Sequence, residues 1–446
     1  FLMGRCAVST QKQKRPFDLR ALAAFAGTLA ILFVLLLAAY ALPGERVRQH
    51  VYDSARTIQN EGLYPEYLGF KLFQMDNYTD TLMLFEAASA DELPPLQAMM
   101  TNTAYNVDNF ETLADDLAWY IEKDWSTGAQ RTDAPALVPF SYARYWHGYL
   151  IWLRPLLLLM PYTGVRIVQY IVLFSLLAVV LVQLRRRCGL RAAVWFAVSQ
   201  LAVSVWFVPH QVQYFTCFMI AYAGCAWVLA KPRRSDVLCL GLLVLGTATA
   251  FCDLLVTPII TLGLPLTCWL LEPQQRLRGG VPQCALAVGG SLCWGTGYAL
   301  CWAGKWALAG AVTGNNVLAD ALHQAEVRTT ADTWRGMELT WRNIFGFLYD
   351  TLNSHHLFWP ALAVLAVLIA LFILSIRSKT ALVRALPLAL TTCMTPAWFV
   401  LLRTHSIQHG WFTWRALGLT VFAGLAFLYY ACDLRAARRR LQKGSI

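Results

Sequence analysis

The stretch LRALAAFAGTLAILFVLLLAAYAL, residues 19–42, decides the fold class of this chain. Its only charge is Arg20, near the start, and at about 1.5 Å per helical residue it is long enough to cross a hydrocarbon core of roughly 30 Å. Basic residues precede it and the sequence AYA at 39–41 resembles a cleavage site, so a signal peptide is the rival interpretation. Because the apolar run exceeds the usual signal-peptide core of about 7–15 residues, we expect a retained membrane helix.

The composition of the whole chain extends this prediction. Of 446 residues, 57% are hydrophobic, only 14% are charged and 17 are Trp. Such a chain is too apolar and too aromatic for a soluble domain, so we predict an all-α polytopic membrane protein with about ten transmembrane helices. The predicted spans after the first are residues 161–184, 192–208, 214–229, 237–251, 259–271, 284–306, 357–376, 385–402 and 416–432.

Lysine and arginine gather on one side of these predicted spans. More than half of the 37 basic residues, and few of the 26 acidic ones, lie in the two terminal segments and four short links. These links are residues 185–191, 231–236, 272–280 and 377–384. The positive-inside rule therefore places the links and both termini in the cytoplasm. The net charge of +11 then reflects membrane orientation and gives no reason to expect nucleic acid as a partner.

The region 237–271 is apolar throughout but has basic clusters on both sides. Two flanks of the same sign require an even number of crossings. We therefore expect two helices, broken near Pro258, with Asp253 at the turn rather than at the middle of the membrane.

This topology divides the chain into seven segments. They are a cytoplasmic N-terminus (1–18), the first span (19–42), an extracytoplasmic loop with amphipathic and interfacial helices (43–160), spans two to seven (161–306), a second extracytoplasmic loop (307–356), spans eight to ten (357–432) and a basic cytoplasmic tail (433–446). Long loops in a compact fold are usually functional or form a domain of their own. Neither loop contains cysteine, so we expect no disulfide framework outside the membrane.

The stretch QMDNYTDTLMLFEAA, residues 74–88, holds two carboxylates at helical spacing in the first loop, Asp76 and Asp80. Asp is favoured at a helix N-terminus because its side chain accepts hydrogen bonds from unpaired N–H groups and its charge complements the helix dipole. We predict a helix capped by Asp76, with Asp80 one turn later on the same face. The two acids fit an N-cap with a solvated neighbour, a metal pair, or a catalytic base with its helper.

The first loop ends in YARYWHGYLIWLRPLLLLMPYTG, residues 142–164, where aromatic residues alternate with Arg144, His147 and Arg154. This mixture is typical of a helix in the headgroup layer. An aromatic anchor explains the Trp and Tyr residues. A platform with both arginines at the height of lipid phosphates explains the basic residues, and the sequence leaves both interpretations open.

More cationic or proton-bearing residues occur at the outer ends of the late spans. Lys305 ends one span, and Arg403, His405, His409 and Arg415 share one short external turn. Charges at a membrane boundary are costly unless they snorkel, pair or bind something. Snorkelling explains one such residue but explains four in one turn less well, so we expect an anionic headgroup such as a phosphate there.

The order of these elements resembles the GT-C superfamily of membrane glycosyltransferases, which use sugars linked to lipid phosphates. The resemblance covers the architecture of nearly the whole chain: an N-terminal anchor, a large first external loop with acidic residues, an interfacial segment, and basic residues in later external turns. Many members carry an acidic pair very soon after the first span. Here Glu45 and Asp53 stand apart, and the denser acidic site comes later in the loop.

The resemblance implies sugar transfer from a polyprenyl phosphate to a glycan, lipid or protein acceptor, on the extracytoplasmic side of a bacterial inner membrane. It assigns the general base to Asp76 or Asp80, with Asp53 behind them, and the leaving phosphate to Lys305, Arg403 and Arg415. The further substrate contacts that we expect are His405, His409, Arg144, His147, Arg154 and Asp253. The sequence indicates no definite cofactor. A divalent cation, Mg or Mn, between carboxylate and phosphate stays open, although no ligand spacing demands one.

Other functions fit the same sequence. An oligosaccharide ligase or polymerase with a lipid-diphosphate donor would use the same basic residues but depend less on a carboxylate. A flippase or transporter for lipid-linked glycans needs ionisable residues along a path through the membrane, and Arg166 and Asp253 are nearly the only charges near span interiors. A non-catalytic membrane scaffold explains the outer loop without acid–base chemistry. The cytoplasmic links are too short for a nucleotide-binding loop, so we do not expect a nucleotide sugar as donor.

Overall fold

The protein is described by a computed structural model that covers residues 17–90, 93–106, 138–277, 280–330, 333–334, 337–353 and 356–433. The described residues are predominantly helical, and seven of their helices are long and apolar enough to cross a membrane. The prediction of an all-α membrane protein is therefore confirmed. The predicted N-terminal segment up to residue 16 and the basic tail after residue 433 lie outside the described residues.

The seven long apolar helices coincide with seven of the predicted spans. They are α1 (Phe17–Tyr40), α7 (Tyr162–Cys188), α9 (Val212–Ala230), α10 (Ser235–Cys252), α13 (Gly280–Thr313), α17 (Lys379–Leu401) and the stretch Gly410–Ala431, which ends in α20 (Leu417–Ala431).

The other three predicted spans contain shorter apolar stretches: α8 (Leu190–Ala202), α11 (Ile259–Leu271) and residues Phe358–Ala370 of α16 (Phe358–Ser375). A 13-residue helix such as α8 or α11 rises only about 20 Å, less than a hydrocarbon core. The number of ten crossings therefore stays a prediction.

Helices α10 and α11 are separate. A non-helical turn joins Cys252 to Ile259, at the place where the sequence predicts the helix to be interrupted. Asp253 directly follows α10, and its carboxylate accepts a hydrogen bond of 3.0 Å from the N–H of Val256. This contact closes the turn between the two helices.

The two predicted external loops supply the remaining elements. The first holds α2 (Glu45–Glu61), the 3-10 turns η1 (Tyr67–Gly69) and η2 (Lys71–Phe73), α3 (Asn77–Ser89), α4 (Pro95–Thr101), the antiparallel strands β1 (Thr103–Asn106) and β2 (Val138–Ser141), and α6 (Leu150–Leu157). The second holds α14 (Val317–Thr330), strands β3 (Thr333–Trp334) and β4 (Met337–Glu338), and α15 (Trp341–Asn353). Short elements between spans are η4 (Val205–His210), α12 (Pro273–Arg276), α18 (Arg403–Gln408), α19 (Gly410–Thr413) and η5 (Trp414–Ala416).

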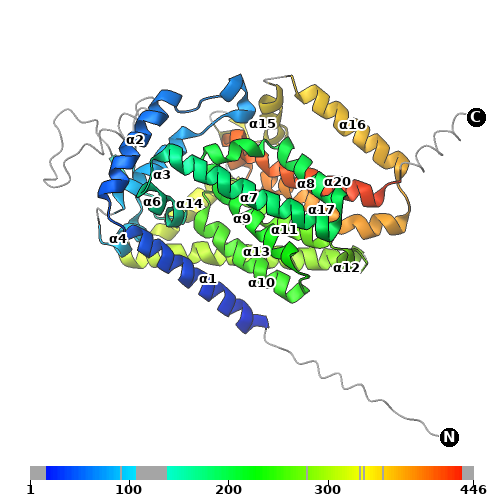
Figure 1. Ribbon diagram of the computed structural model, residues 1–446, viewed down its shortest axis with the longest axis horizontal. Coiled ribbons are helices and arrows are strands. Elements are labelled where there is room, and N and C mark those ends of the chain that lie inside the picture. Colours follow the sequence, from blue (N-terminus) through cyan, green and yellow to red (C-terminus); the bar gives the residue numbers. More distant parts are fainter. Residues whose placement is uncertain are drawn as a thin grey trace, which may run out of the picture.

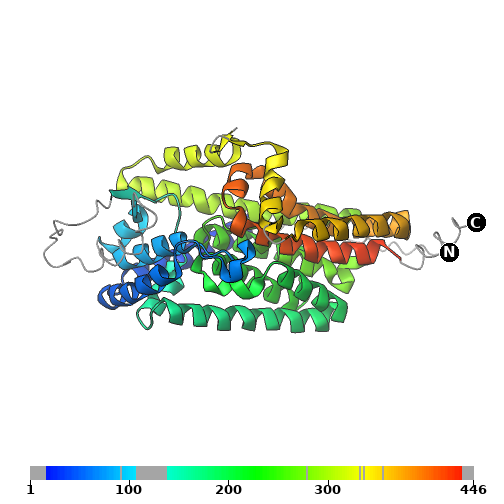
Figure 2. The ribbon, with the colours of Figure 1, turned by 90° about the horizontal axis from the view of Figure 1, so that it is seen from above.

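These elements separate along the length of the molecule. In Figure 1, α2, α3, α4 and α6 gather at one end, and α12 lies towards the other. Figure 2 shows the yellow-green α14 of the second loop over the same end as the blue helices of the first. The two predicted loops therefore share one end of the helix bundle.

The aromatic segment before α7 is not the interfacial helix that the sequence predicts. Only Leu150–Leu157 forms a helix, and Trp146 is 1% exposed. Its indole stacks on Phe251 with ring centroids 4.7 Å apart and donates a 2.8 Å hydrogen bond to the carbonyl of Cys301. The segment packs inside the protein because α10 and α13, more than a hundred residues away in sequence, supply partners for its rings.

Helices α10 and α13 approach each other closely through glycine. A Cβ at Gly246 would lie 2.0 Å from the carbonyl oxygen of Trp294, and one at Gly297 would lie 2.2 Å from that of Leu243. Small residues at helix crossings allow such backbone contact, which is a main source of packing energy in membranes.

We expect Gly246→Ala to destabilise the protein, because the added methyl group forces the α10–α13 crossing apart at a cost of about 1–3 kcal/mol. The check is the melting temperature of the purified protein in detergent micelles. Gly289→Ala on α13 is the matched control, since a Cβ there meets no atom within 4 Å. Equal melting temperatures for the two variants would contradict the close crossing.

Candidate functional site

A cavity of about 500 Å³ lies at the end of the molecule where the two external loops meet. One face of α3 forms part of its wall, since Thr79, Leu82, Met83 and Glu86 follow helical spacing and all line the cavity. The segment that contains Tyr142 and Arg144, and the turn between the last two apolar helices, form the other walls.

Asp76 lies at the N-terminus of α3 and lines this cavity. Its Oδ1 accepts a 3.0 Å hydrogen bond from the N–H of Thr79, and its Oδ2 accepts one of 2.9 Å from the Thr79 hydroxyl. The backbone N–H of Asp76 donates to Oε1 of Gln211 over 2.9 Å. The predicted N-cap is therefore present, and these contacts fix the carboxylate at the cavity wall.

Burial changes the acidity of Asp76. Desolvation disfavours the charged form and raises the pKa of its carboxyl to about 6, although the two hydrogen bonds from Thr79 act in the opposite direction. A carboxylate with a pKa close to neutral is well matched to accept a proton at physiological pH.

Glu86 is a second carboxylate on the cavity wall, ten residues along the chain and about 15 Å along the helix from Asp76. It accepts a 2.9 Å hydrogen bond from Asn102 and another from the Tyr149 hydroxyl, and Nδ1 of His147 lies 2.5 Å from its Oε2. Glu86 is not among the site residues predicted from the sequence. The available signal was its position on the same helical face as Thr79.

Arg144 brings positive charge to the cavity. Its guanidinium lies 4.6 Å from the ring centroid of Tyr142 and donates a 3.2 Å hydrogen bond to Asp320 on α14. This ion pair joins the first external loop to the second. Its Nε is buried and has no hydrogen-bond partner among the described residues, so a donor remains for a ligand.

His409 also lines the cavity, beside Trp411, at a ring-centroid distance of 5.4 Å. Burial, with a smaller contribution from the charge of Arg328, lowers the pKa of His409 to about 3. The imidazole is therefore neutral at pH 7. Its Nδ1 is buried without a hydrogen-bond partner in the described part of the chain, which leaves it free to bond to a ligand.

Asp80 does not lie beside Asp76 at the cavity. Its side chain is fully buried and accepts hydrogen bonds of 2.9 and 3.0 Å from the N–H groups of Val212 and Gln213, and one from the Tyr162 hydroxyl. It therefore caps the N-terminus of α9. The prediction that Asp76 and Asp80 share one helix face is therefore wrong. The Asp76 side chain bonds to Thr79, and positions 79 and 80 point about 100° apart around the helix.

Three predicted cations, Lys305, Arg415 and Arg154, are also fully buried away from the cavity. Each donates to backbone carbonyl oxygens. Lys305 donates to the carbonyl of Met99 (2.7 Å) and to the side chain of Asn102 (2.5 Å). Arg415 donates to the carbonyls of Trp411 (3.0 Å) and Leu72 (2.9 Å). Arg154 donates to the carbonyls of Tyr40 (3.1 Å) and Leu42 (3.0 Å). The structure therefore does not assemble the basic rim that the sequence suggests, because these groups bind chain segments to one another.

The remaining predicted site residues do not line the cavity either. Asp53 is exposed on α2, and Arg403 is half-buried at the start of α18. His405 is buried, with its Nε2 2.8 Å from the carbonyl oxygen of Leu255. Asp253 closes the turn after α10. His147 is buried behind the wall, where it contacts Glu86.

No protein-family model matches the chain, and no curated protein or solved structure gives a significant match. Among the described residues, no three His, Cys, Asp or Glu side chains form a group that could hold a metal ion. The cavity itself is the basis for a functional assignment.

We expect Asp80→Asn to destabilise the fold. The amide keeps one oxygen but places an NH2 group against one of the two α9 N–H groups, and an unsatisfied buried donor costs about 1–3 kcal/mol. The check is the melting temperature in micelles at pH 7. Asp53→Asn, at an exposed position, is the control. An Asp80→Asn protein as stable as this control would contradict the capping role.

Proposed function

We propose that this protein is an integral-membrane glycosyltransferase that moves a sugar from a polyprenyl-phosphate-linked donor to an acceptor, with Asp76 as general base. One observation carries the proposal: a single cavity combines a carboxylate whose pKa is near neutral, several aromatic rings and an arginine with an unpaired donor.

The lining of the cavity suits a sugar. Its volume of about 500 Å³ lies within the usual range for small-molecule sites, roughly 300–1,000 Å³. Tyr64, Tyr142 and Trp411 offer apolar ring faces for the C–H faces of a pyranose, while Asp76 and Glu86 offer acceptors for its hydroxyl groups.

The reaction follows from these positions. The acceptor hydroxyl oxygen attacks the anomeric carbon, its proton passes to the Asp76 carboxylate, and the bond from that carbon to the phosphate oxygen breaks. The polyprenyl phosphate leaves with the bonding electron pair. Each carboxylate oxygen of Asp76 accepts one hydrogen bond from Thr79, and the side chains of Trp411 and Gln213 also contact the carboxylate. In this proposal the acceptor hydroxyl replaces one of the latter two contacts.

Arg144 takes the role of phosphate contact in this proposal. It lines the cavity, whereas Lys305 and Arg415 are committed to carbonyl groups elsewhere. A guanidinium suits a phosphate because it offers several donors in one plane. Neutral His409 contributes a hydrogen bond to the sugar or the acceptor rather than a charge.

The orientation belongs to the same proposal. The cavity lies at the end of the bundle opposite the basic links (Figure 1), and the positive-inside rule favours the extracytoplasmic side for it. In this proposal the membrane is a bacterial inner membrane. The acceptor there is a glycan, a lipid or a protein.

We expect Asp76→Asn to lower transfer by about 10²–10⁴-fold, because general-base catalysis is typically worth that much. Asn caps helices as well as Asp does, so the variant removes the base and keeps the fold. The measurement is sugar transfer in vesicles with polyprenyl-phosphate sugar donors, at matched protein levels. Asp53→Asn is the control and keeps full activity.

Two results would count against this assignment. If the wild-type protein transferred sugar from none of these donors, the assignment as a glycosyltransferase would be wrong. Full activity of Asp76→Asn with a lipid-diphosphate glycan donor, together with loss of activity in Arg144→Gln, would favour the ligase or polymerase instead.

The pH dependence of transfer follows from the acidity of Asp76. Its pKa is about 6 and a base acts only when ionised, so kcat/KM rises with pH through about 6 and levels off above it. Initial rates between about pH 5 and pH 8 test this. A profile that falls over the same interval would rule out Asp76 as the base.

A further inference from the structure

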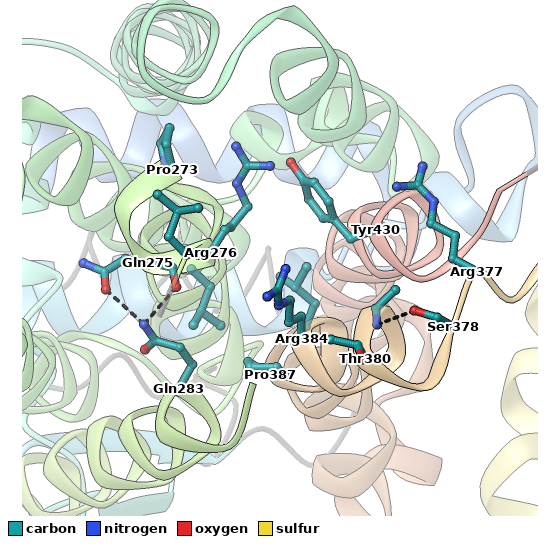
Figure 3. Close-up of a pocket in the computed structure, with 14 residues that line it drawn as sticks. Pro273, Gln275, Arg276, Gln283, Arg377, Ser378, Thr380, Arg384, Pro387 and Tyr430 are labelled. Atoms are coloured by element: carbon teal, nitrogen blue, oxygen red, sulfur yellow. Dashed lines mark hydrogen bonds between the residues drawn. The ribbon is translucent and has the colours of Figure 1, made fainter. Parts of the chain in front are cut away.

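A second cavity, of about 440 Å³, lies at the other end of the molecule (Figure 3). It is lined by the ends of four elements: the end of α11 with α12, the start of α13, the start of α17 and the end of α20. Because α11, α13, α17 and α20 all correspond to predicted spans, the cavity lies at the depth where lipid headgroups meet the protein.

Three arginines line this cavity, and none of the described residues that line it is acidic. The Arg276 guanidinium lies 4.7 Å from the ring centroid of Tyr430. Nε of Arg377 donates to the carbonyl of Cys432 over 2.5 Å. Figure 3 shows Arg384 directed into the space between Gln283 and Tyr430. The cavity therefore holds three positive charges without a lining carboxylate to balance them.

Backbone contacts fix the elements that carry these side chains. A Cβ at Gly280 would lie 1.6 Å from the carbonyl oxygen of Val383, so α13 and α17 touch directly beside Arg384. An isolated β-bridge joins Ile376 to Cys432, next to Arg377. All three arginine side chains are exposed, so their charges face the open side of this fixed frame.

The cavity also offers polar groups that a headgroup would satisfy. Gln283 is 3% exposed; its Nε2 donates to the Gln275 carbonyl and side chain, but its Oε1 is buried with no partner among the described residues. Ser378 caps the N-terminus of α17, a 23-residue helix, where the helix dipole favours an anion.

An apolar contact favours a lipid over a soluble anion. Leu277, which follows Arg276 and lines the same cavity, is 85% exposed. An exposed leucine beside a cationic pocket suits a membrane surface, where its side chain packs against acyl chains.

We propose that this cavity binds the phosphate-bearing headgroup of an anionic phospholipid with a free hydroxyl, in the leaflet opposite the Asp76 cavity. The arginines contact the phosphate, and Gln283 accepts a hydrogen bond from the hydroxyl. A general positive-inside distribution accounts for basic residues on this side of the membrane but not for three of them around one hollow.

The test is native mass spectrometry of the full protein in detergent micelles, titrated with phosphatidylglycerol or with phosphatidylcholine. We expect the wild type to bind phosphatidylglycerol preferentially. An arginine near a membrane surface contributes about a fivefold effect on anionic lipid binding, so Arg276→Gln with Arg384→Gln weakens binding about 25-fold. Arg186→Gln is the matched control. Arg186 is exposed at the end of α7, next to the Arg187–Glu272 ion pair at the same end of the molecule, but it does not line the cavity.

Each outcome decides one point. Equal binding of the two lipids would contradict the proposed site. So would a loss of phosphatidylglycerol binding in Arg186→Gln as large as the loss in the double variant. If glycerol 3-phosphate displaces the lipid at a similar concentration and depends on Arg276 and Arg384 in the same way, that result contradicts a lipid as the ligand and indicates a site for a soluble phosphate ester. The experiment measures binding alone, so it is independent of sugar transfer at the Asp76 cavity.

Discussion

The hydrogen bonds from the N-terminus of α9 to the Asp80 carboxylate hold the external part of the molecule to the helix bundle. They tie α3 to a span more than a hundred residues away, and the bond between Asp76 and Gln211 lies beside them. With Asp80 fixed against the bundle, the face of α3 with Thr79, Met83 and Glu86 turns towards the cavity. The carboxylate that holds the helix and the carboxylate at the cavity are therefore different residues.

Buried charges elsewhere follow the same physical rule. A charge removed from water is tolerated only where hydrogen bonds replace its hydration. Lys305 and Arg415 meet most of this requirement by donating to backbone carbonyl groups, although Nε of Arg415 is buried with no hydrogen-bond partner among the described residues. Arg144 meets it only in part, through Asp320 and the ring of Tyr142, and keeps an unpaired Nε. Position separates these cations, because Arg144 lines the cavity, whereas Lys305 and Arg415 do not.

The two cavities have opposite electrostatic character at opposite ends of the bundle. The first combines two carboxylates with one arginine and aromatic rings. The second has three arginines and no described acidic side chain in its lining. The first suits a neutral sugar with one phosphate, and the second suits a phosphate group alone. A membrane protein that handles a lipid-linked substrate on one face and is anchored to anionic lipid on the other would have this distribution.

The sequence by itself determined the class of fold, the positions of the apolar helices, the break between α10 and α11, and the capping of α3 by Asp76. These features depend on hydropathy and on side chains next to a helix end, which are local properties. Tertiary structure alone decided which charged residues reach a cavity. Asp80, Lys305 and Arg415 had the right chemistry, but their partners come from residues far along the chain. Glu86 and the arginine cavity at the other end emerge only when separate elements pack together, because no spacing along one segment records which neighbours a side chain meets.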